Sequence, residues 1–213
     1  ALQREGLELR MAMPTADGRI ELAALDRLID RNTRLVEVSL VAMYNGFEHD
    51  LKAVCDLAHS RGAYVYADII QGVGAVPFDV RATGIDFAAA SGFKWLMGDF
   101  GLGFLYVRSD LIDRVVKRTT WGYDSSPDLE THLLPSDSPD QAPFTWTLGS
   151  DAGATFEVGS RAAASLMALA ASLPYLRELG VDRIQAWRQP LLGTLRAELT
   201  RLGFSPVTPP GTT

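Results

Sequence analysis

The amino-acid sequence is poor in the residues that build several common kinds of site. Its 213 residues include one cysteine, Cys55, so a disulfide framework within the chain is excluded. Cys55 falls on the apolar side of a predicted helix, and we expect it to be a buried structural residue. The three histidines, His49, His59 and His132, are too scattered to form a metal site, and the first two are expected to be solvated.

Long apolar runs and positive charge are also scarce. The sequence contains no run of about 18 apolar residues and no charged-then-apolar leader, so we expect no membrane association and a cytoplasmic location. Its 20 Lys and Arg are outnumbered by 26 Asp and Glu, which gives a formal net charge of −6. Such a chain lacks the excess of positive charge that neutralises a phosphate backbone, so nucleic acid is not an expected partner.

What the sequence does have is a regular alternation of strand and helix patterns. With 47% apolar and 22% charged residues, the chain can bury a substantial core. Apolar runs predict strands over residues 34–43, 63–68, 85–91 and 103–108, and helical spacing predicts a helix over 49–62. This β-α-β order predicts an α/β fold, in which a mostly parallel (mixed) sheet is sandwiched by helices on both faces.

The second half of the chain changes in character. Residues 119–149 are rich in Pro, Asp and Ser but also carry aromatic residues, which favours a functional lid over a disordered segment. Beyond them, helical spacing predicts one helix from Glu157 to Gly180. A second predicted helix ends at Gly203, and Pro190 is expected to kink it.

Two charged residues stand out at the predicted strand ends. Asp68 ends an apolar strand, and Lys94 follows another within the apolar stretch FKWLM, with no acidic neighbour before Asp99. Ligands of parallel sheets bind beyond the carboxyl ends of the strands, so both side chains are expected to project into one crevice. A lysine in this position can reach the surface, bind a phosphate, form an imine, or pair directly with Asp68.

A cofactor between the two side chains would satisfy both of them. Pyridoxal phosphate (PLP) has a ring nitrogen that favours a carboxylate partner and an aldehyde carbon that reacts with an amine. PLP is therefore the cofactor that this pair of residues predicts. A direct ion pair between Asp68 and Lys94, closing the edge of the sheet, stays open as the simpler alternative.

Residues 65–108, VYADIIQGVGAVPFDVRATGIDFAAASGFKWLMGDFGLGFLYVR, resemble the core of a known family. The family is the class V aminotransferases, a group that includes cysteine desulfurases, isopenicillin N epimerase-like proteins and kynureninase. The resemblance runs through a D-x-x-Q element at Asp68 and Gln71 and an S-x-x-K element at Ser91 and Lys94. It implies the large domain of a PLP-dependent transferase of fold-type I.

The resemblance also implies a role for individual residues. Lys94 would form the imine with PLP and move protons, and Asp68 would pair with the pyridinium nitrogen. Gln71 would donate to the phenolic oxygen of the cofactor, and Ser91 would bind its phosphate. Ser160 would reach the phosphate held by the neighbouring subunit, which implies a homodimer with shared active sites.

The implied activity is that of a PLP-dependent transferase or lyase acting on an amino acid through a lysine Schiff base. Transamination, epimerisation, desulfurisation and β-cleavage all remain open. By the resemblance, residues 1–180 form a PLP-binding large domain, the middle part of the family's chain, and residues 181–213 form a helix leading toward a C-terminal small domain.

Three departures from the family pattern support a second hypothesis. Phe93 stands where the family often has His or Tyr, and Met43 stands where Asn is common, with Asn45 nearby but displaced. Family members are also roughly twice as long as a domain of this size. The alternative is a catalytically silent fragment, or a structural partner, that retains the fold.

Overall fold

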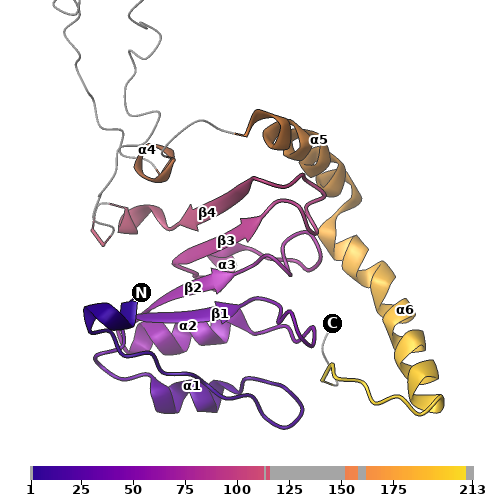
Figure 1. Cartoon of the computed structure of the whole chain (residues 1–213), viewed down its shortest axis with the longest axis horizontal. Helices are drawn as coiled ribbons and strands as arrows, with labels where there is room; N and C mark the ends of the chain where they lie inside the picture. The colour runs from indigo at the N-terminus through magenta and orange to yellow at the C-terminus, as the bar shows by residue number, and fades with distance from the viewer. Residues whose placement is uncertain (1, 113, 116–151, 158–161, 210–213) are drawn as a thin grey trace, which may run out of the picture. The chain divides into compact units, whose positions relative to one another are not determined.

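The computed structural model describes residues 2–112, 114–115, 152–157 and 162–209 (Figure 1). Their contacts divide the chain into two compact units, Ala1–Leu105 with Ala164–Thr213, and Tyr106–Ala163. The predicted lid at 119–149 and the predicted site residue Ser160 lie outside the described residues. The domain boundary predicted at residue 180 stays a prediction.

A four-stranded sheet organises the described part of the chain. Its strands, in spatial order, are β1 (Leu35–Ser39), β2 (Tyr64–Asp68), β3 (Phe87–Ser91) and β4 (Gly103–Val107). β1, β2 and β3 are parallel, and Figure 1 draws β4 in the opposite direction. The sheet is therefore mixed, as predicted. Because three strands are parallel, their carboxyl ends meet at one edge.

Six helices accompany the sheet in the described residues. They are α1 (Leu22–Leu28), α2 (Leu51–Ser60), α3 (Val80–Thr83), α4 (Ala152–Phe156), α5 (Ala163–Leu179) and α6 (Val181–Arg201), with short 3-10 turns at Leu2–Glu5 and Ser109–Leu111. In this part of the chain, no helix combines the length and apolar character needed to cross a bilayer. The helix predicted to end at Gly180 is α5, and α6 runs through Pro190.

Alternating burial along the strands decides where α2 packs. Val36 and Val38 of β1 and Val65 and Ala67 of β2 are buried, whereas the residues between them are more exposed. Every second residue of a strand points to the same face of the sheet, so the face that carries these buried residues packs against the core. Helices α2 and α3 lie behind the sheet in Figure 1, and α2 contacts β2. Cys55 of α2 is buried, as predicted.

The observed ends of β1 and α2 differ from the ends that the sequence pattern predicted. The predicted strand 34–43 is longer than β1 because the chain turns after Ser39, and Val41 forms an antiparallel bridge with Glu48. α2 begins after Asp50, whose carboxylate accepts a 3.0 Å hydrogen bond from the Ala53 N–H and so caps the helix. Gly62, at φ +78°, closes the other end.

His59 is exposed, as predicted, but its ring also has a partner in the core. Its Nε2 lies 2.7 Å from Oδ2 of Asp86, a fully buried carboxylate just before β3. The same oxygen accepts a 2.7 Å hydrogen bond from the Val65 N–H of β2. A buried carboxylate needs polar partners, and the last turn of α2 ends beside Asp86, so the partly exposed imidazole can reach it.

The prediction that His49 is solvated was wrong. Its exposed fraction is 8%, because its ring packs edge-on against Phe47 and lines a cavity of about 290 Å³ together with Leu25. Burial disfavours the charged imidazolium, so it lowers the pKa of His49 below the ordinary value of 6.5.

This burial predicts a pH dependence of stability. A histidine with a lowered native pKa binds its proton more readily in the unfolded chain, so the free energy of unfolding falls as the pH drops below 6.5. We expect a His49→Leu variant to lose less stability than the parent between about pH 8 and about pH 5, measured by urea denaturation. Equal losses in the two proteins would contradict this assignment.

Candidate active site

Asp68 lies at the carboxyl end of β2, opposite Ala89 of β3. Its Oδ1 accepts a 3.0 Å hydrogen bond from the Ile70 N–H, which orients the carboxylate at the start of the turn that carries Gln71. Tyr66, two residues earlier, lies on the same face of the strand. Burial raises the pKa of Tyr66, and the negative charges of Asp68 and Glu37 raise it further.

Lys94 lies in the connection between β3 and β4, residues 92–102, which we call the lysine loop. Its base is closed by two hydrogen bonds of 2.9 Å, from the Gly92 N–H to the Leu102 carbonyl and from the Gly98 N–H to the Gly92 carbonyl. Between them, the Met97 N–H donates to the Lys94 carbonyl at 3.0 Å. The backbone that carries the lysine is therefore tied at three points.

Met97 completes this loop in an unusual conformation. Its φ of +58° is the only positive value at a non-glycine residue among the described residues. A side chain in the left-handed region costs about 1–2 kcal/mol, and such conformations persist where the surrounding structure enforces them. The surrounding loop therefore holds Met97 in a conformation that its side chain disfavours.

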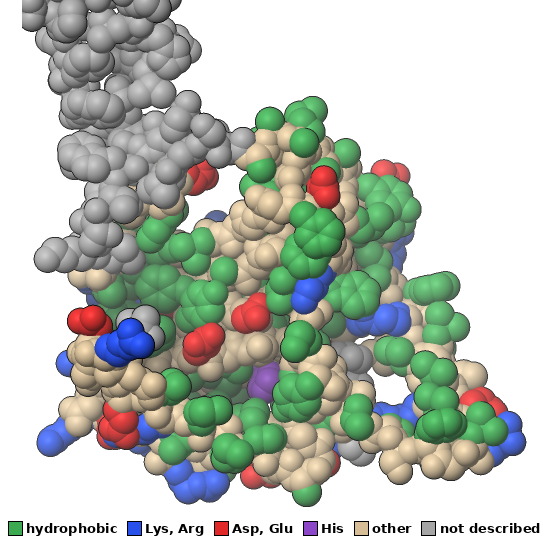
Figure 2. Space-filling view, viewed as in Figure 1, with side chains coloured by type: hydrophobic (Ala, Val, Ile, Leu, Met, Phe, Trp, Pro, Cys, Tyr) green, Lys and Arg blue, Asp and Glu red, His purple; other side chains and the backbone are tan. Residues whose placement is uncertain are grey.

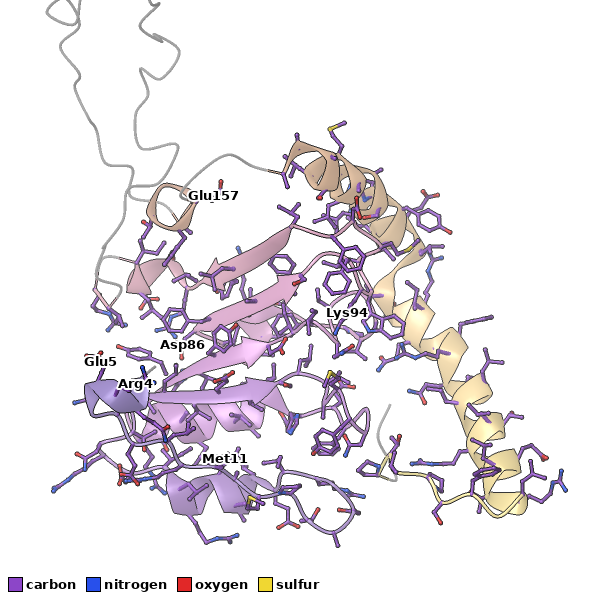
Figure 3. All side chains as sticks on the ribbon, in the orientation of Figure 1. Arg4, Glu5, Met11, Asp86, Lys94 and Glu157 are labelled. Atoms are coloured by element: carbon purple, nitrogen blue, oxygen red, sulfur yellow. The ribbon has the colours of Figure 1, made fainter. Side chains whose placement is uncertain are left out.

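An aromatic ring lies near the Lys94 amine. The Nζ atom lies 6.0 Å from the centroid of the Phe93 ring, and that ring stacks on Phe100 with centroids 4.6 Å apart. Phe93 therefore supplies packing and no hydrogen bond through its side chain. Figure 3 shows Lys94 beyond the carboxyl ends of the strands.

Asp68 and Lys94 do not form the ion pair that the sequence left open. Among the described residues, the Lys94 ammonium has no carboxylate partner and Asp68 has no cationic partner. Within the same part of the chain, the side chains of Gln71 and Ser91 also make no hydrogen bond. A carboxylate oxygen, an amine, an amide and a hydroxyl are thus available near one edge of the sheet, and this donor set fits the polar groups of PLP.

Asn45 does not take the place of the asparagine that the family commonly has at position 43. It is buried, its Nδ2 donates to the Gly18 carbonyl at 2.9 Å, and its Oδ1 accepts from the Phe47 N–H at 3.0 Å. Both ends of the amide are therefore used to hold a turn. Met43 itself is 79% exposed.

Two residues of α5 contact the lysine loop and were not predicted from the sequence. Ser165 donates to the Phe100 carbonyl at 2.5 Å across 65 residues of sequence, and Leu169 packs against Gly92 and Gly98. The helical spacing of this segment indicated an apolar face but not its partner. Only the folded chain shows that this face meets the loop that carries Lys94.

Comparisons with known proteins agree with this arrangement. The family model for class V aminotransferases matches residues 1–210. A cysteine desulfurase from Yersinia pestis (strain Pestoides F) is 34% identical over 197 residues, which cover 92% of this chain and 45% of the relative. A cysteine desulfurase from Klebsiella pneumoniae (strain 342) is 33% identical over 189 residues, covering 89% of this chain and 43% of the relative.

Solved structures show the same fold. A cysteine desulfurase from Thermococcus onnurineus NA1 superposes with a TM-score of 0.80 at 25% identity, covering 99% of this chain and 50% of that protein. The chain therefore spans about half the length of the proteins it matches. Because the family model covers nearly the whole sequence, the chain belongs to the class V aminotransferases, a family of PLP-dependent enzymes of fold-type I.

Proposed function

We propose that this chain forms the cofactor-binding part of a PLP-dependent enzyme that acts on an amino acid, with Lys94 as the residue that holds PLP covalently. The observation that carries the proposal is the placement of Asp68 and Lys94 near one sheet edge without an ion pair between them. A carboxylate and an amine that do not neutralise each other are both available to a bound group.

Each residue of the set has a task in this proposal. When bound, PLP supplies an electron sink for carbanionic chemistry at the amino acid. Asp68 holds a positive charge on the ring nitrogen, Gln71 hydrogen-bonds the phenolic oxygen, and Ser91 binds the phosphate. Lys94 anchors the cofactor and moves a proton at the substrate α-carbon. Ser160 is proposed as a phosphate contact to the neighbouring subunit.

Cysteine is the first substrate to test. The Yersinia and Klebsiella relatives are cysteine desulfurases, and a further similar structure is a complex of a cystine C–S lyase with its reaction product, cysteine persulfide. That structure is 25% identical to this chain and superposes with a TM-score of 0.60. These names favour cleavage at a carbon–sulfur bond over transamination or epimerisation.

We also propose a homodimer that works in the cytoplasm. Large apolar side chains are exposed on α5 and α6 (Figure 2). Among them, Met167 is 69% exposed and Trp187 is 74% exposed. Gathered apolar exposure of this kind marks protein interfaces. The homodimer with shared sites follows from the family resemblance and from the role given to Ser160.

The direct test is covalent capture of the cofactor. Purified protein is mixed with PLP, its visible absorbance is recorded, and the sample is reduced with borohydride before peptide mass mapping. We expect a yellow protein and a reduced PLP adduct on the peptide that contains Lys94. A colourless protein with no adduct would favour the alternative, a silent fragment or structural partner that keeps the fold.

Removing the charge of Asp68 is expected to weaken cofactor retention. An Asp68→Asn variant keeps an oxygen for the Ile70 N–H but loses the carboxylate. A hydrogen bond to a charged group contributes about 1.5–3 kcal/mol, so PLP should dissociate about 10- to 100-fold more readily, and α-proton exchange should slow. The matched control is Asp56→Asn, which changes an exposed carboxylate paired with Lys52. Parent-like retention in Asp68→Asn would refute the role.

A further inference from the structure

We infer that Ser165 and Leu169 of α5 are positioning residues for Lys94, acting through the lysine loop. This inference rests on the proposed function of Lys94. Neither Ser165 nor Leu169 touches the cofactor in that proposal. Their role is to set the geometry of the loop that carries Lys94.

Leu169 fills the space that side chains would need at both glycines of the loop base. A Cβ atom added at Gly92 would lie 2.9 Å from Cδ1 of Leu169, and one added at Gly98 would lie 2.6 Å from its Cδ2. The same two glycines are joined by the 2.9 Å hydrogen bond from the Gly98 N–H to the Gly92 carbonyl. Leu169 therefore presses on the point where the loop closes.

Ser165 fixes the far side of the same loop. Its exposed fraction is 5%, and its hydroxyl donates to the Phe100 carbonyl at 2.5 Å. Phe100 stacks on Phe93, the residue next to Lys94. Residues four apart on a helix lie on the same face, so Ser165 and Leu169 reach the loop together.

The buried residues of α5 form this contact and the apolar cluster beside it. These residues are Ser165, Leu169 and Leu176. Leu169 and Leu176 form one apolar cluster with Leu96, which lies two residues after Lys94 in the lysine loop. The helix thus holds the loop on both sides of the lysine, at the glycine base before it and at Leu96 after it.

This packing has a consequence for the chemistry. Met97 sits in a left-handed conformation that the surroundings must enforce, and its N–H holds the Lys94 carbonyl. If α5 no longer presses on the loop, the backbone at Lys94 gains freedom and its amine loses its fixed direction. Loss of orientation slows a reaction even where every reacting group is still present.

The first experiment needs no cofactor. Hydrogen exchange is measured for the Gly92, Met97 and Gly98 amides in the parent, in Leu169→Ala and in Leu173→Ala. Leu173 lies on the same helix but is 44% exposed, so it is a matched control. We expect exchange at these amides to rise about tenfold or more in Leu169→Ala only. Equal protection in all three proteins would overturn the inference.

A compensating pair tests the contact itself. All the close neighbours of a Cβ at Gly92 are atoms of Leu169, so Gly92→Ala is expected to disturb the loop. In the double variant Gly92→Ala with Leu169→Ala, the new methyl group gains room, and loop protection should return toward the parent value. Leu169→Val, which removes one methylene group and so still makes room, serves if the alanine variant unfolds. If the losses of amide protection in the two single variants simply add up in the double variant, Leu169 does not contact Gly92 in the way inferred here.

The second readout uses the loaded protein. The absorbance of PLP bound at Lys94 is titrated with pH, and we expect its midpoint to move away from the parent value in Leu169→Ala and Ser165→Ala but not in Leu173→Ala. Ser165→Thr, which keeps the hydroxyl, should restore the parent midpoint. Parent-like midpoints in both loop-facing variants would show that α5 does not position Lys94. A parent that binds no PLP would instead defeat the proposed function, and the exchange data would still decide the loop contact.

Discussion

Replacing Lys94 with alanine is expected to abolish covalent retention of PLP. The ammonium of Lys94 has no carboxylate partner among the described residues, so its removal breaks no ion pair there and should leave the fold intact. After borohydride reduction, the peptide that contains position 94 should carry no adduct. If Lys94 also moves the α-proton, exchange of that proton should slow by about 10²- to 10⁴-fold.

The control for this experiment is Lys52→Ala. Lys52 is an exposed lysine of α2 that pairs with Asp56 at 2.6 Å, and its loss should leave PLP binding unchanged. An adduct that persists at another lysine in Lys94→Ala would contradict the assignment of position 94. Parent-like proton exchange in Lys94→Ala would contradict the second role while leaving the first to be judged by the mass map.

The second large effect is expected on stability and not on chemistry. Replacing Asp86 with alanine removes the acceptor of the Val65 N–H, and Val65 is itself fully buried. An unpartnered buried N–H costs about 1–3 kcal/mol, and the cavity left by the carboxylate adds to that cost. We expect a fall of about 3 kcal/mol in the free energy of unfolding, measured by chemical denaturation.

His59→Ala is the matched comparison for Asp86→Ala. It removes one partner of the carboxylate but leaves the 2.7 Å bond from the Val65 N–H in place. Because the His59 side chain is 35% exposed, its loss should cost less, on the order of 1 kcal/mol. If Asp86→Ala lowers the free energy of unfolding by no more than His59→Ala does, the Asp86 carboxylate is not the group that stabilises this contact.

The predictions for Lys94 and Asp86 concern opposite ends of the strands of one sheet. Asp86 lies before β3, near its amino end, and Lys94 lies beyond its carboxyl end, as Figure 3 shows. At the amino end, Asp86 holds α2 to the sheet through His59, and at the carboxyl end Lys94 carries the proposed chemistry. A variant of Lys94 that unfolds the protein, or a variant of Asp86 that removes only PLP binding, would reverse this division.

Local patterns in the sequence determined the fold class and the neighbourhood of the site. Alternating strand and helix signals predicted the mixed α/β sheet, because apolar periodicity reflects which faces are buried. Asp68 and Lys94 were expected at one edge because the carboxyl ends of parallel strands must meet. The D-x-x-Q and S-x-x-K elements pointed to the family that the model for class V aminotransferases identifies.

The tertiary structure alone decided which groups are partners. The bond between His59 and Asp86, the burial of His49, the use of Asn45 in a turn and the contact of Leu169 with Gly92 and Gly98 join residues from separate elements. Periodicity tells which face of a helix is apolar, but not what that face will meet. The partner is set by how the elements pack, and packing depends on the whole chain at once.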